Sequence, residues 1–200
     1  MKAIKHIKDT YGLVLCGGQS NRMGTDKSML PYYNKPQRYH VNDMLLPFCE
    51  QVFISCSKEQ ANSIDAGYDF IEDAALYRDI GPMAALLSAF TLHPHKHLLM
   101  IGCDYPFLNT TELETFSKLC TDIPVSFYNA EAAIYESMMA WYPSSCFEEL
   151  KRMFAAKAFS LQQLLRKTDA IKYVPTDIRC IKSIDTIQAY NQTIKALNAE

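Results

Sequence analysis

Two segments of the sequence carry residue types that suit phosphate chemistry, and the first is Leu15–Lys27 (LCGGQSNRMGTDK). It contains three glycines and two cations, namely Gly17, Gly18, Gly24, Arg22 and Lys27. Glycines let the backbone come close to a ligand, and consecutive exposed amide groups form a concavity that binds anions. This composition suits a triphosphate, although a polar surface loop with glycines in its turns explains it equally well. The segment is not a P-loop, because Lys27 follows Asp26 and not a glycine. It does not match the G-x-G-x-x-G dinucleotide motif either.

The second segment, Ile101–Pro106 (IGCDYP), places Asp104 after a short apolar run and before a proline. A carboxylate at the end of a buried strand is a suitable ligand for Mg²⁺, which takes one or two carboxylates together with phosphate oxygens and water. On these residues alone, an aspartate that begins a turn before Pro106 is the simpler interpretation.

The elements that must position these segments are apolar strands alternating with helices. The pattern predicts strands at 12–16, 51–57, 68–72 and 97–103, with helices at 36–49 and 82–92. Beyond Asp104 it predicts a helix capped by Thr110 or Thr111, strands at 125–128, 133–141 and 171–175, and helices at 144–154, from 160, and at 185–197. Such alternation is typical of a Rossmann-like α/β fold, a mostly parallel sheet with helices on both faces. Ligands of these sheets bind beyond the carboxyl ends of the strands, where both segments fall.

Composition and charge narrow the class of protein. With 200 residues, 48% apolar and 21% charged, the chain is expected to form one globular domain. A formal net charge of −2 gives no basic field for a polynucleotide, so we expect no nucleic-acid partner. The apolar runs are too short to cross a membrane, and seven cysteines without a C-x-x-C pair predict reduced thiols in a cytoplasmic protein. His93, His95 and His97 are expected in a solvated loop, because no cysteine or carboxylate adjoins them to complete a metal site.

The order of residues in the first segment closely resembles the signature of nucleotidyltransferases that activate phosphorylated metabolites. Within that superfamily it is most similar to the loop LAGG-x-x-x-R-M-G-x-D-K of the molybdenum cofactor guanylyltransferases, with Cys16 in place of the usual alanine. Cys103–Phe107 (CDYPF) resembles the family's C-D-x-P-[FY] segment, whose aspartate holds the metal. Glu72–Asp73, followed by Gly81–Pro82, resembles its E-D…G-P-L-A-G stretch, whose aspartate contacts the nucleotide. The likeness covers nearly the whole chain, strongly to about Pro106 and loosely beyond.

The resemblance implies an enzyme that transfers GMP from Mg²⁺-bound GTP to molybdopterin, giving the guanine dinucleotide cofactor and pyrophosphate. It implies catalytic roles for Arg22, Lys27 and Asp104, with Asp104 as the Mg²⁺ ligand. The implied nucleotide-binding residues are Leu15, Cys16, Gly17, Gly18, Arg22, Lys27, Ser55, Asp73 and Asp104. It further implies a nucleotide-binding half at about 1–110, an acceptor-binding half at about 111–200, and contact with other proteins of molybdenum cofactor biosynthesis or molybdoenzyme maturation.

Two departures from the family leave the base and the acceptor open. Ser55 stands where the family has an asparagine on the guanine side. Ser183 and Asp185 replace two asparagines of the acceptor side, and the added carboxylate would repel a pterin phosphate unless Mg²⁺ or a basic side chain intervenes. The alternatives are a CTP-dependent or sugar-phosphate-type nucleotidyltransferase of the same fold, and a non-catalytic nucleotide-binding regulatory protein. The joint presence of Arg22, Lys27 and Asp104 favours an enzyme over the last of these.

Overall fold

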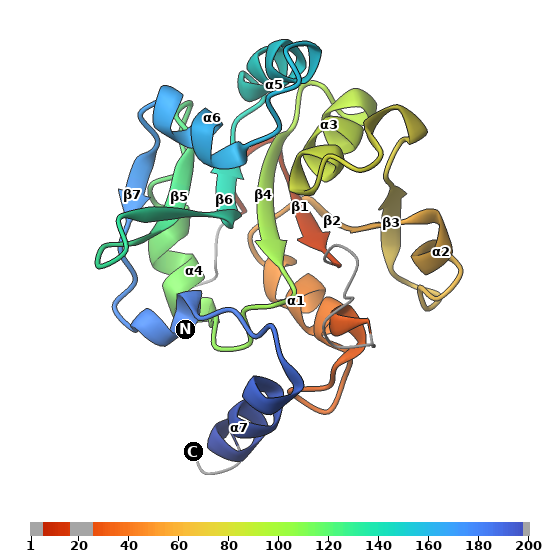
Figure 1. Cartoon of the computed structure of the whole chain (residues 1–200), viewed down its shortest axis with the longest axis vertical. Coiled ribbons are helices and arrows are strands. Elements are labelled where there is room, and N and C mark those ends of the chain that lie inside the picture. Colours follow the sequence, from red (N-terminus) through yellow and green to blue (C-terminus); the bar gives the residue numbers. More distant parts are fainter. Residues whose placement is uncertain (1–5, 17–25, 198–200) are drawn as a thin grey trace.

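The structure, a computed structural model, describes residues 6–16 and 26–197 (Figure 1). Its strands are β1 (Thr10–Leu15), β2 (Gln51–Cys56), β3 (Asp69–Glu72), β4 (His97–Gly102), β5 (Val125–Asn129), β6 (Ile134–Tyr142) and β7 (Ile171–Tyr173). Its α-helices are α1 (Gln37–Leu45), α2 (Lys58–Ala61), α3 (Pro82–Leu92), α4 (Thr110–Ser117), α5 (Cys146–Ala155), α6 (Leu161–Lys167) and α7 (Ile187–Leu197). Three short 3₁₀ turns are η1 (Lys27–Met29), η2 (Ala75–Tyr77) and η3 (Ile178–Ile181).

The strands form one sheet in the order β3-β2-β1-β4-β6-β5-β7. β6 runs antiparallel to its neighbours β4 and β5, and the other neighbouring pairs are parallel. The predicted mostly parallel α/β sheet is therefore confirmed. Because β1, β2, β3 and β4 are mutually parallel, their carboxyl ends share one edge, to which the arrowheads of β1 and β4 point in Figure 1.

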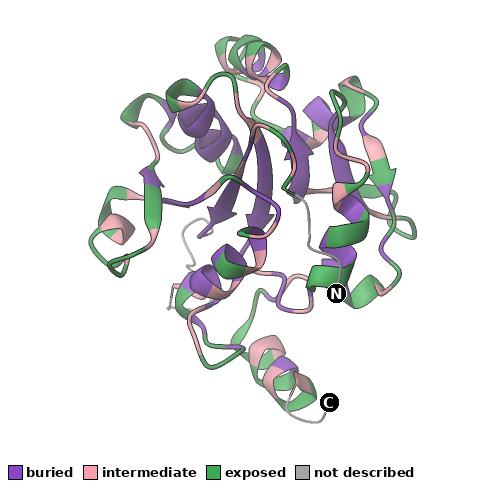
Figure 2. Cartoon of the chain, turned by 180° about the vertical axis from the view of Figure 1, so that it is seen from behind, coloured by how far each residue is buried: buried purple, intermediate pink, exposed green. Residues whose placement is uncertain are grey.

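The central strands are apolar on both sides because helices cover both faces of the sheet. Successive residues of β1 alternate between two cores: Leu13 packs on the side of α3, α5 and α6, and Val14 packs on the side of α1 and α4. Figure 2 shows the strands at the centre of the buried region. A strand buried on both faces reads as a continuous apolar run, which is why the sequence reveals β1 and β4 so clearly.

One local prediction, the cap of the helix after Asp104, is wrong. Asn109, and not Thr110 or Thr111, caps α4, and its side-chain oxygen accepts a hydrogen bond from the backbone N–H of Glu112 at 3.0 Å. His93 and His95 lie in the predicted loop between α3 and β4, and His97 is the first residue of the predicted strand. His97 lies on β4, where its Nδ1 accepts from the backbone N–H of Ser144 at 3.0 Å, and the ring of His93 packs 5.0 Å from that of Tyr11.

All seven cysteines are unpaired and six are buried, as predicted for thiols that pack as small apolar groups. None of the helices in residues 6–16 and 26–197 is long and apolar enough to cross a membrane. Helix α7 lies beyond the carboxyl edge of the sheet (Figure 1). Its residues pack on a small separate cluster made by Leu30, Tyr32 and Ile184.

Candidate functional site

The described residues assigned to the nucleotide gather at the shared carboxyl edge of the sheet. Leu15 ends β1 beside Gly102, its register partner at the end of β4. The backbone N–H of Cys16 donates to the carbonyl of Ser55 at 3.3 Å, and that of Cys103 donates to the carbonyl of Leu15 at 3.0 Å. Three chain segments far apart in the sequence thus meet within one hydrogen-bonded layer. The other three assigned residues, Gly17, Gly18 and Arg22, lie outside the described residues.

Ser55 and Asp73 meet at one end of this edge, because β2 and β3 are neighbours. The hydroxyl of Ser55 donates to Asp73 Oδ1 at 2.9 Å, and the backbone N–H of Asp73 donates to the carbonyl of Cys56 at 3.0 Å. Ser55 is buried and Asp73 is half-buried. Burial raises the pKa of the Asp73 carboxyl, while the bond from Ser55 lowers it. The pair forms a polar wall beside the end of β1.

Asp104 lies two residues beyond the end of β4, and its carboxylate folds back toward Gly102, the last residue of that strand. A Cβ on Gly102 would lie 2.6 Å from Asp104 Oδ1, so only glycine leaves room for the carboxylate there. Burial is the main reason that the pKa of Asp104 is raised to about 6; the carboxylates of Asp185 and Glu136 contribute to the rise, and Lys27 opposes it. A half-buried carboxylate that other carboxylates influence is stabilised by an added cation. This donor set therefore fits a Mg²⁺ ion, although the described residues contain no group of three or more His, Cys, Asp or Glu side chains that could hold a metal.

Lys27 reaches the same place from the turn η1. Asp26 caps this turn by accepting from the backbone N–H of Ser28 at 2.9 Å, and its second carboxylate oxygen accepts from Gln60 Nε2 at 2.8 Å. The Nζ of Lys27 lies 2.5 Å from Asp185 Oδ1. The backbone N–H of Ile184 donates to the carbonyl of Asp104 at 2.9 Å, so the segment that carries Asp185 is attached to the segment that carries Asp104.

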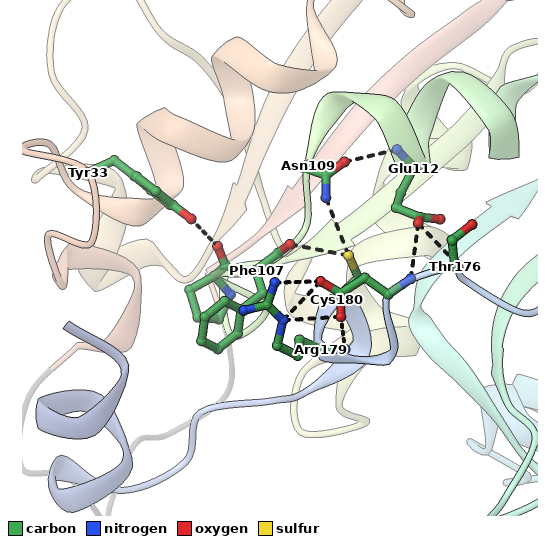
Figure 3. Close-up of polar contacts among 9 residues, drawn as sticks. Tyr33, Phe107, Asn109, Glu112, Thr176, Arg179 and Cys180 are labelled. Carbon is green, nitrogen blue, oxygen red and sulfur yellow. Dashed lines mark hydrogen bonds and ion pairs between the residues drawn. The ribbon is translucent and has the colours of Figure 1, made fainter. Parts of the chain in front are cut away.

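A network of contacts holds the chain after Asp104 in place (Figure 3). The hydroxyl of Tyr33 donates to the carbonyl of Pro106 at 2.7 Å, and the thiol of Cys180 donates to the carbonyl of Phe107 at 3.2 Å. The buried carboxylate of Glu112 accepts from the backbone N–H of Thr176 at 3.0 Å and from the hydroxyl of Tyr173. The loop after β4 is thus fixed between the segment preceding α1 and the C-terminal segment.

Sequence reasoning missed one acidic residue of this region, Glu136 on β6. Its carboxylate accepts from the hydroxyl of Tyr105 at 3.1 Å, and burial raises its pKa. It also contributes to the raised pKa of Asp104. The sequence signal that could have identified Glu136 is a charged residue within the otherwise largely apolar run Ile134–Tyr142. The described part of the site therefore combines one lysine with several carboxylates, an arrangement suited to a phosphate compound that arrives with a metal cation.

Comparison with known proteins agrees with this description. The family model described as "MobA-like NTP transferase domain" matches residues 12–171. The chain is 27% identical over 186 residues to a "Molybdenum cofactor biosynthesis bifunctional protein" of Synechocystis sp., a match that covers 91% of this chain and 53% of that relative. It therefore spans about half the length of that protein. It is 25% identical over 154 residues to a "Molybdenum cofactor guanylyltransferase" of Pseudomonas entomophila, covering 76% of this chain and 80% of the relative.

Solved structures share the fold. "Molybdopterin-guanine dinucleotide biosynthesis protein A" from Archaeoglobus fulgidus superposes with a TM-score of 0.76 at 20% identity, covering 96% of this chain and 100% of the other. "A nucleotidyl transferase" from Methanothermobacter thermautotroptrophicus superposes with a TM-score of 0.70 at 12% identity, covering 95% and 98%. At these identities the likeness shows that the α/β architecture is common to all three proteins.

Proposed function

The chain belongs to the family of MobA-like NTP transferase domains, which makes it a nucleotidyltransferase, and from this premise we propose that it transfers GMP from Mg²⁺-bound GTP to molybdopterin. The products are the guanine dinucleotide cofactor and pyrophosphate. The relatives named molybdenum cofactor guanylyltransferase support this choice of substrates. Contact with other proteins of molybdenum cofactor biosynthesis or molybdoenzyme maturation is part of the same proposal.

One observation carries the proposal: a lysine and a half-buried carboxylate from distant segments occupy one edge of the sheet. Lys27 and Asp104 both interact with Asp185, and Ile184 joins the two regions through a backbone hydrogen bond. Nucleotidyl transfer needs both kinds of group, because negative charge develops on the leaving phosphates while the α-phosphate is attacked. Neither group has a role in filling the hydrophobic core.

The proposed reaction needs no covalent nucleophile from the protein. A phosphate oxygen of molybdopterin attacks the α-phosphorus of GTP, and the bond to the bridging oxygen of pyrophosphate breaks on the opposite side. Lys27, together with Arg22 and the amides of Gly17 and Gly18, would bind the leaving pyrophosphate. Holding two phosphates in line supplies a large share of the rate enhancement, since it replaces a bimolecular encounter.

Asp104 is the residue that would hold the metal. Mg²⁺, when bound, neutralises charge on the phosphates. The contribution of the chain is to keep the Asp104 carboxylate in place, through the glycine at 102 and the buttressed loop beyond it. Leu15, Cys16, Ser55 and Asp73 would line the nucleoside side. Ser55 and Asp73 together offer a hydroxyl and a carboxylate, which suit the N–H groups of a guanine.

The test combines binding with transfer. Thermal melts with Mg²⁺ and each of GTP, CTP, ATP and UTP should show the largest stabilisation with GTP, about 2.7 kcal/mol at a concentration near 100 Kd. Incubation with molybdopterin and GTP labelled at the α-phosphate should then move the label to the pterin and release pyrophosphate. Tighter binding of CTP than of GTP would assign the chain to a cytidylyl enzyme. Binding of GTP without release of pyrophosphate in the presence of molybdopterin would favour another acceptor, such as a sugar phosphate, or a regulatory protein.

A further inference from the structure

Asp185 occupies the charged end of the lysine on which the proposed nucleotide depends. Its Oδ1 lies 2.5 Å from Lys27 Nζ, and its Oδ2 accepts from the hydroxyl of Ser183 at 2.8 Å. The side chain of Asp185 is 50% exposed, whereas that of Lys27 is 21% exposed. The carboxylate is thus the more exposed partner of the pair, and a phosphate that approaches Lys27 from solvent would compete with it.

The surroundings of this pair are acidic among the described residues. Asp104 lies close enough for its ionisation to be affected by both Asp185 and Glu136. Glu136 comes from β6 and Asp104 from the end of β4, so the carboxylates converge from separate elements. The backbone bond from Ile184 to Asp104 at 2.9 Å attaches the backbone next to Asp185 to the segment of Asp104, whether or not the contact with Lys27 is made. A displaced Asp185 therefore remains beside the bound phosphates.

We infer that Asp185 makes the site selective for a nucleoside triphosphate complexed with a divalent cation over the metal-free triphosphate. This inference rests on the proposed function, since it assumes that Lys27 binds the nucleotide. A metal-free triphosphate loses part of its attraction to Lys27 and meets a displaced carboxylate. A triphosphate that carries a divalent cation has two fewer negative charges, and its cation is complementary to the same carboxylate. Asp185 thus penalises the wrong form of the nucleotide more than the correct one.

The experiment measures binding without turnover. Isothermal titration calorimetry is performed with α,β-methylene-GTP, which cannot release pyrophosphate, on the wild type and on Asp185→Asn, with either EDTA or excess Mg²⁺. The ratio of the two dissociation constants gives the selectivity for the Mg²⁺ form. We expect Asp185→Asn to lower this ratio about tenfold, mainly by tighter binding in EDTA, because removing one charge a few ångströms from another at a partly exposed site has an effect of this order.

Two matched variants complete the design. Asp185→Glu keeps the carboxylate and should retain most of the selectivity. Glu148→Gln removes the same charge from an exposed ion pair with Lys151 on α5, outside the site, and should leave both dissociation constants unchanged. Thermal melts of each variant check that it folds.

Three results would overturn the inference. Two dissociation constants that both stay unchanged in Asp185→Asn would show that the carboxylate does not affect binding. An equal gain in affinity with and without Mg²⁺ would show that Asp185 only competes for Lys27. Failure of the wild type to bind the analogue in either condition would refute the proposed function itself, and the selectivity with it.

Discussion

Replacing Asp104 by asparagine separates the effect of this half-buried carboxylate on stability from its proposed role in binding Mg²⁺. Burial and neighbouring carboxylates raise the pKa of this group from 3.8 to about 6 in the folded protein. Between these two pH values the folded state holds a proton that the unfolded chain releases. The free energy of unfolding therefore falls as the pH rises through this window. Across the whole window the free energy of unfolding falls by about 3 kcal/mol, because each pH unit between the two pKa values corresponds to about 1.4 kcal/mol.

Asparagine at this position has nearly the same size and no charge, so the variant avoids this loss. We expect Asp104→Asn to be more stable than the wild type at pH 8, by up to about 3 kcal/mol, and equally stable at pH 4. In a chain of this size that gain corresponds to a rise in Tm of about 6–12 °C. The assay is a series of thermal and urea melts from pH 4 to pH 8, without nucleotide or metal.

Nucleotide binding and turnover, unlike stability, should fall in Asp104→Asn. Mg²⁺ with GTP should raise the Tm of the wild type but hardly that of Asp104→Asn, and turnover of the variant should fall by a factor of about 100 or more. Asp177→Asn is a matched control, because the pKa of Asp177 is shifted in the opposite direction. The hydrogen bond from Arg179 lowers this pKa. The ionised carboxylate of Asp177 therefore stabilises the fold at high pH, and this stabilisation is lost as the pH falls. That variant should be slightly less stable at pH 8. An Asp104→Asn protein no more stable than the wild type at pH 8, or one that responds fully to Mg²⁺ with GTP, would refute the reasoning.

Two further predictions concern the partners of Asp104. Lys27→Ala should lower kcat/KM for GTP at least about 100-fold, as expected for the loss of a cation that faces developing charge, while the free energy of unfolding changes by no more than about 1 kcal/mol, since a partly exposed ion pair contributes little. Steady-state kinetics and melts check both halves, and near-normal turnover would remove Lys27 from the mechanism. Gly102→Ala should weaken binding of Mg²⁺-GTP about tenfold in calorimetry, because its Cβ would displace Asp104 Oδ1. Unchanged affinity in Gly102→Ala would mean that binding of Mg²⁺-GTP does not depend on the observed position of the Asp104 carboxylate.

Much of the architecture could be predicted from local patterns. β1 and β4 appear as apolar runs because both faces of each strand are buried, and each run is followed directly by the residues proposed to bind the nucleotide. The alternation of strands and helices likewise predicted the parallel half of the sheet. The roles assigned to the site residues, the division into two halves and the cytoplasmic location remain predictions.

Local patterns failed where a side chain depends on a partner from another part of the chain. The cap of α4 was assigned to a threonine, although Asn109 has the better acceptor for the N–H of Glu112. His97 was correctly predicted to begin a strand, but the packing of its ring 5.0 Å from that of Trp141 across the β4–β6 pair was not predicted. Asn109 and Trp141 are both present in the sequence, but their distances to the N–H of Glu112 and to the ring of His97 are known only from the structure.

By itself, the sequence determined the fold class and the approximate positions of the strands, because burial and backbone preferences act over a few residues and leave a local pattern. It also singled out two segments that we propose to bind phosphate. Only the tertiary structure decided which charges face one another. Lys27 and Asp185 are 158 positions apart, and Ser55 meets Asp73 because β2 lies beside β3. Glu136 reaches the site through the antiparallel pairing of β6 with β4. Such contacts depend on strand order and register, which result from the packing of the whole chain, and no short window of sequence contains that information.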